Sequence, residues 1–99
     1  MGKPKIIWSH KAQIKLFEIL EYYTQRNKSK VYSIKLYNKF TKELSLLHFQ
    51  PEIGVKTEIE PVRGLIVDEY ILFYEITTSQ IIVHTIWDCR QNPNDLIIK

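Results

Sequence analysis

Four lysines in the first half of the chain have a spacing that suits contact with phosphate groups. Lys28, Lys35, Lys39 and Lys42 follow one another at intervals of seven, four and three residues. Such intervals place side chains on one face of a helix, and a ridge of ammonium groups can bind the phosphates of a nucleic acid. The same pattern is typical of a solvated helix face. The sequence therefore leaves both interpretations of these lysines open.

The cysteine and the histidines lack the spacing of a metal or nucleophile site. Cys89, His10, His48 and His84 are scattered along the chain, whereas zinc ligands come in closely spaced pairs. No histidine and acid are arranged around Cys89 in a way that would activate its thiol. His84 lies within an apolar strand pattern, which favours a structural role. No glycine-rich phosphate loop is present, and we expect no metal and no cofactor.

A cytoplasmic location is predicted from cysteine usage and from hydropathy. A single cysteine cannot form an internal disulfide. The first residues carry charge but no apolar core of a signal peptide, and no run approaches the roughly 18 apolar residues that a membrane span needs. We therefore expect neither secretion nor membrane insertion.

Charge is divided unevenly between the two halves of the chain. Residues 1–50 hold ten Lys or Arg against three Glu, a balance of +7, and residues 51–99 hold four basic against eight acidic residues, a balance of −4. This asymmetry favours an anionic partner on one face of the protein. Surface helices that are simply rich in lysine explain it equally well.

The first half of the sequence predicts a strand and a helical hairpin. Residues 5–8 are β-prone, and Ser9 is a good N-cap for a helix from His10 to about Arg26. Asn27 is the expected left-handed stop. A second helix is expected from about Ser29 to Phe49, where its apolar stripe ends before a proline.

The second half predicts three strands in an antiparallel meander. The segments 62–67, 70–76 and 81–87 are rich in β-branched and aromatic residues, and short polar turns separate them. The segment 90–99 is expected to form an irregular end. The order of elements predicts one α+β domain over residues 1–99, a two-layer sandwich with both helices on one face of the sheet. The opposite face is then partly open and suits a binding site.

Four features together resemble the RelE/ParE superfamily of bacterial toxins. The first is the strand followed by a helical hairpin. The others are the segment Pro51–Gly54, the sequence RGLIVDEYILFYEI over residues 63–76, and the ending IWDCRQNP over residues 86–93. The resemblance spans nearly the whole chain.

The resemblance implies the toxin half of a type II toxin-antitoxin module, with growth inhibition or plasmid stabilisation as its role. It also implies a cognate antitoxin that binds the domain and forms a hetero-oligomer with it. A sheet edge and an apolar groove on a small protein can accept such a strand or helix. The superfamily has two activities, which are ribosome-dependent cleavage of messenger RNA and poisoning of DNA gyrase.

For the RNA-cleaving branch, the resemblance implies three catalytic cations. Arg63, expected to open the central strand, matches an arginine near the scissile phosphate, Arg90 matches a basic residue after the last strand, and Lys56 lies near the position of a catalytic lysine. Metal-free cleavage also needs a base and an acid. The alternative for Arg63 is a salt bridge to Glu75, Asp68 or Asp88. The alternative for Arg90 is a salt bridge to Asp88 or a cap on the C-terminal segment. Trp87 is a candidate for stacking on a base or for contact with a target, and core packing is its alternative.

The tail departs from the RNA-cleaving pattern. That branch usually carries a tyrosine, or a histidine and a tyrosine, beyond the last strand, and residues 91–99 contain neither. This departure favours inhibition of DNA gyrase, with Lys35, Lys39, Lys42 and Trp87 as candidate target-binding residues. The alternatives are a ribosome-dependent mRNA endonuclease with an unusual acid and base, and a non-toxic interaction domain of the same fold.

Overall fold

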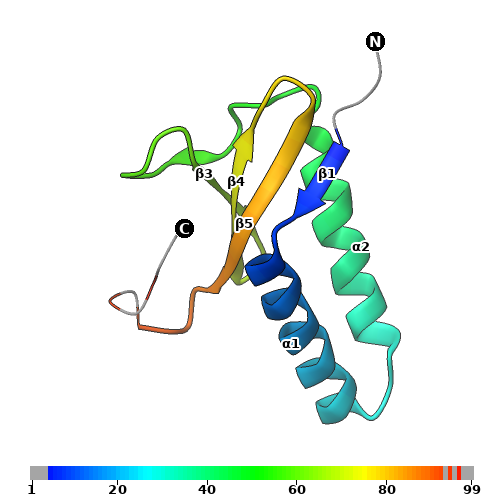
Figure 1. Ribbon diagram of the computed structural model, residues 1–99. Coiled ribbons are helices and arrows are strands. Elements are labelled where there is room, and N and C mark those ends of the chain that lie inside the picture. The colour runs from blue at the N-terminus through cyan, green and yellow to red at the C-terminus, as the bar shows by residue number, and fades with distance from the viewer. Residues whose placement is uncertain (1–4, 93, 95, 97–99) are drawn as a thin grey trace.

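The computed structural model of the chain describes residues 5–92, 94 and 96, and in it a helical hairpin lies against one face of a twisted sheet (Figure 1). The predicted two-layer α+β architecture is confirmed. The expectation for the tail falls partly on residues 93, 95 and 97–99, which lie outside the described residues.

The first strand and helix follow the predicted boundaries closely. Strand β1 spans Lys5–Trp8 and helix α1 spans His10–Asn27. The Ser9 hydroxyl accepts a hydrogen bond from the Ala12 amide at 3.0 Å, so Ser9 is the predicted N-cap. The left-handed residue that ends α1 is Lys28, with φ of 51°, and not Asn27. The helix therefore includes Asn27 and ends one residue later than predicted.

Helix α2 is shorter at both ends than its apolar stripe suggested. It spans Val31–Leu46, whereas residues 29–49 were expected to be helical. Beyond Leu46 the amides of His48 and Phe49 bond three residues back, to Ser45 and Leu46, and these tight turns end the α-helix. Leu47 is still buried there, which is why the apolar pattern continues past the helix.

The sheet has five strands in the order β1-β5-β4-β3-β2. The predicted meander corresponds to β3 (Arg63–Val67), β4 (Tyr70–Ile76) and β5 (Gln80–Asp88). A two-residue strand β2 (Val55–Lys56), which was not predicted, pairs with β3. Strand β1 runs parallel to β5, so the sheet is mixed, and β4 is its central strand. Arg63 therefore opens β3, not the central strand as predicted.

The core lies between the helices and one face of the sheet. Tyr70, Leu72 and Tyr74 of β4 are buried there against α2, where Phe40 is fully buried. The register of β5 shifts opposite Phe73 and Tyr74, so that one extra residue lies in β5. This irregularity lets Val83 and Ile86 both reach the core, although they are three residues apart.

Candidate functional site

Arg90 lies at one end of the sheet and is held by a set of hydrogen bonds. Its guanidinium binds both carboxylate oxygens of Asp88, at 2.9 and 2.8 Å, and forms an ion pair with Glu69 at 3.2 Å. A further N–H group points to the hydroxyls of Tyr23 and Tyr70 at 3.4 Å. Helix α1, strand β4 and the end of β5 are joined through this one side chain. The predicted bridge to Asp88 is present.

These contacts shift the ionisation of the cluster. Hydrogen bonds to Asp88 raise the pKa of Arg90, and the same bonds lower the pKa of Asp88. Burial raises the pKa of Tyr70, and the bond between its hydroxyl and that of Tyr23, 3.1 Å long, adds to the effect. Each shift favours the ionisation state that completes the network. The Arg90 guanidinium is therefore already bonded to neighbouring side chains.

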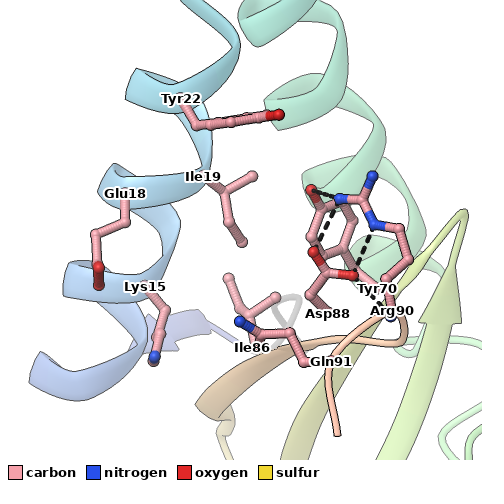
Figure 2. A pocket seen from close by; sticks show the side chains of 9 residues that line it. All are labelled: Lys15, Glu18, Ile19, Tyr22, Tyr70, Ile86, Asp88, Arg90 and Gln91. Carbon is pink, nitrogen blue, oxygen red and sulfur yellow. Dashed lines mark hydrogen bonds and ion pairs between the residues drawn. The ribbon is translucent and has the colours of Figure 1, made fainter.

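A cleft of about 370 Å³ opens beside this cluster (Figure 2). Lys15, Glu18 and Tyr22 of α1 form one wall, and Asp88 and Arg90 form the other. Basic and acidic groups are balanced on these walls. The cleft consequently lacks the excess of positive charge that a phosphate-binding site would have.

Arg63 and Lys56 lie together at the start of β3, away from Arg90. They face one another as paired residues of β3 and β2. The Arg63 guanidinium donates to the backbone oxygens of Gly54 at 2.9 Å and Glu52 at 3.4 Å. Arg63 thus binds the segment that leads into β2.

The three predicted catalytic cations do not converge on one point. Arg63 pairs with Tyr74, whereas Asp88, two residues before Arg90, pairs with Tyr70. Four residues of β4 separate the two positions, about 13 Å at roughly 3.3 Å per residue. The structure brings Lys56 to Arg63 and places Arg90 at the other end of the meander.

Three lysines of the predicted ridge, Lys35, Lys39 and Lys42, lie on α2, whereas Lys28 is the left-handed residue that ends α1. Lys35 and Lys42 are exposed, and Lys39 forms an ion pair of 2.6 Å with Asp68 in the turn between β3 and β4. That hydrogen bond raises the pKa of Lys39. Among the described residues, Lys35 and Lys42 therefore form no ion pair, and Lys39 supports the fold.

Trp87 is half-buried and pairs with Ile71 on the sheet face away from the core. His84 Nε2 lies 2.9 Å from a carboxylate oxygen of Glu75, which agrees with a structural role. Among the described residues, no group of three or more His, Cys, Asp or Glu side chains is arranged to hold a metal ion. None of the described helices is long and apolar enough to cross a membrane.

An apolar groove on the outside of the helical hairpin was not predicted. Two adjoining hollows share Phe17, Leu20 and Tyr37, and together they run from β1 across α1 to α2. Phe17 is 67% exposed and Ile34 is 57% exposed. A signal was present in the sequence, because both residues fall outside the core-facing stripe of an otherwise regular helix.

A hydroxyl network holds the two walls of this groove together. The Ser33 hydroxyl of α2 donates to the backbone oxygen of Leu20 in α1 at 2.7 Å, and it lies 2.7 Å from the Thr24 hydroxyl. Small polar residues at these positions let the helices approach closely. These hydrogen bonds link α1 and α2 along one side of the groove.

Comparison with known proteins gives a family match and a structural match. A family model described as the ParE toxin of the type II toxin-antitoxin system, parDE, matches residues 6–93. A chain of the chromosomal ParDE system from P. aeruginosa is 17% identical in sequence, with a TM-score of 0.71, over 87% of this chain and 96% of that chain. It shares the fold described above. No curated protein sequence matches.

Proposed function

The chain belongs to the ParE toxin family of type II toxin-antitoxin systems, and on this premise we propose that it arrests growth by inhibiting DNA gyrase in the cytoplasm until an antitoxin binds it. The choice of gyrase rests on the tail, because residues 91–99 lack the tyrosine and histidine that the RNA-cleaving branch usually carries. The match to the family model agrees with the predicted superfamily.

One observation carries the choice of a binding toxin over a nuclease. The cations that RNA cleavage would require are divided between two ends of the sheet, and each arginine is already bonded to the protein. A phosphorane-like transition state needs its cations, its base and its acid within contact of one phosphate. Inhibition through binding needs no such convergence.

The apolar groove of the helical hairpin suits the antitoxin. An amphipathic helix or an extended segment can place apolar side chains beside Phe17, Ile34 and Tyr37. The groove reaches β1, which is the terminal strand of the sheet. Within the described part of the chain β1 pairs only with β5, so its other edge can pair with an added strand of the antitoxin, and one peptide can use both features.

The test is expression of the chain from a tight inducible promoter, with translation rate, DNA replication and the DNA damage response measured in the same cells. We expect replication to stop and damage signalling to rise while messages stay intact. Co-expressed antitoxin should prevent both the replication stop and the damage signalling. In vitro, the purified protein should inhibit supercoiling by gyrase.

Two results would overturn the proposal. Prompt translation arrest with ribosome-dependent mRNA cuts that disappear in Arg63→Ala or Arg90→Ala would establish the endonuclease instead. Normal growth without antitoxin would indicate a domain of the same fold that has lost toxicity. A variant with unchanged folding, such as Val31→Ser on the exposed start of α2, is the matched control for expression level.

A further inference from the structure

The end of the sheet opposite the groove carries a second exposed apolar surface. Ile53, Val55 and Ile66 are 49%, 60% and 61% exposed. Val55 pairs with Gly64, so Val55 and Ile66 are on the same face of neighbouring strands. That face points away from the helices, because the alternate residue Leu65 belongs to the core. Exposed aliphatic groups gathered in this way are typical of a contact surface.

Acidic residues flank this apolar group. Glu52 precedes β2, and Glu58 and Glu60 follow it. None of the three forms an ion pair within the part of the chain that the structure describes. By contrast, Asp68, Glu69 and Asp88 each bind a basic side chain. Lys56 and Arg63 are the two basic residues of this segment, so residues 52–63 keep a balance of −1, although the whole chain carries a formal charge of +3.

We propose that this β2-edge surface, defined as Glu52, Ile53, Val55, Glu58, Glu60 and Ile66, contacts the target of the toxin and fits a basic protein surface with an apolar recess. Charge complementarity selects the partner. A basic target surface matches the three carboxylates, which outnumber Lys56 and Arg63 in the segment, and desolvation of the aliphatic side chains adds to the contact. The proposal rests on the proposed function, because it identifies the face through which the target is bound.

The position of the surface separates it from the groove. Strand β2 lies at one edge of the sheet and β1 at the other. Four strand spacings, about 19 Å at roughly 4.8 Å each, lie between them. Substitutions in the β2-edge surface are therefore expected to weaken target binding without changing antitoxin binding.

The experiment compares two surface variants with two matched controls. The variants are Val55→Ser/Ile66→Ser, which removes apolar contact, and Glu58→Lys/Glu60→Lys, which reverses charge. The controls are Val31→Ser, at a residue that is 68% exposed, and Glu43→Lys on α2. Each protein is measured for inhibition of gyrase supercoiling, growth arrest, melting temperature and affinity for the antitoxin.

We expect both surface variants to inhibit gyrase at least about tenfold less than the wild type, as the loss of central interface contacts does. Growth arrest should weaken in parallel. The melting temperature and the antitoxin affinity should not change, and both controls should behave as the wild type does.

Three results would overturn the proposal. The first is undiminished growth arrest by the surface variants. The second is a selective loss of antitoxin binding, which would assign the surface to the antitoxin. The third is a wild-type dimer that the substitutions convert to a monomer, which would assign it to a second copy of this chain.

Failure of the gyrase proposal gives a different pattern. Wild-type protein would then leave supercoiling unchanged while it still arrests growth. Growth arrest does not depend on which target is bound, so loss of arrest in both surface variants would still support the β2-edge surface.

Discussion

Tyr74 and Gly54 are twenty residues apart in the sequence, and the Tyr74 hydroxyl accepts a hydrogen bond of 3.1 Å from the Gly54 amide. The same hydroxyl donates to the backbone oxygen of Pro51 at 3.0 Å. Tyr74 is almost fully buried, so its hydroxyl reaches out of the core to bind the segment before β2. Arg63 binds the Gly54 carbonyl from the other side. The core thereby fixes the position of the β2-edge surface.

Removal of the Tyr74 hydroxyl should weaken the fold. Tyr74→Phe leaves the Gly54 amide without its partner in a buried site, and an unsatisfied buried group costs about 1–3 kcal/mol. The free energy of unfolding, measured by urea denaturation, should fall by that amount. Tyr37→Phe, at a more exposed tyrosine, is the control and should change it little. Equal stability of Tyr74→Phe and the wild type would contradict this role.

A methyl group at Gly64 should be poorly tolerated. An added Cβ would lie 2.8 Å from Cγ2 of Ile71 and 3.4 Å from the Phe73 ring. Overpacking of this kind costs about 1–3 kcal/mol, so Gly64→Ala should lower the melting temperature. Ile71→Ala removes the atom that would clash, so Gly64→Ala should cost much less stability in an Ile71→Ala background than in the wild type. An equal cost in both backgrounds would show that the glycine serves another purpose.

The periodicity of the sequence predicted the elements better than it predicted the site. The apolar stripes of α1 and α2 and the alternation in β3, β4 and β5 are local patterns, and the structure confirms those elements. Strand β2 has only two residues, Val55 and Lys56, which is too short for a pattern. The segment before it is held by the side chains of Tyr74 and Arg63, and no local pattern reveals these contacts.

The separation of Arg63 from Arg90 also required the register of the sheet. Both arginines border strands, and the sequence places them at a strand start and beyond a strand end. Antiparallel pairing then decides whether such ends meet. Here Arg63 lies opposite Tyr74, and the end of β5 lies opposite Tyr70. The extra residue in β5 shifts part of that register, and alternation alone does not reveal it.

Acid should weaken the Arg90 cluster through Asp88. Hydrogen bonds from Arg90 hold the pKa of Asp88 below the usual value of about 3.9 for aspartate. Below that usual value the unfolded chain binds a proton that the folded chain still excludes, so the stabilisation is present above about pH 4 and is lost as pH falls. The free energy of unfolding should therefore fall less steeply between about pH 5 and pH 2 in Asp88→Asn than in the wild type.

A second variant checks the cause of that pH dependence. Arg90→Ala keeps the Asp88 carboxylate and removes the group that lowers its pKa. Its free energy of unfolding should change with pH below about pH 5 as that of Asp88→Asn does. A pH dependence like that of the wild type would show that another group is responsible. Urea denaturation at a series of pH values measures all three proteins under the same conditions.

Antitoxin binding should depend on Phe17 while the fold does not. Its ring is largely exposed at the point where the two hollows of the groove meet, so Phe17→Glu removes apolar contact and adds a charge that the antitoxin would have to desolvate. A central aromatic anchor contributes about 2 kcal/mol or more to binding, which corresponds to a loss of affinity of roughly 30-fold. Calorimetry with purified antitoxin measures this change, and Phe49→Glu, at a similarly exposed phenylalanine outside the groove, is the matched control.

Since Phe17→Glu keeps the β2-edge surface, it should still arrest growth, even in the presence of antitoxin. Unchanged antitoxin affinity in Phe17→Glu would place the antitoxin on another face.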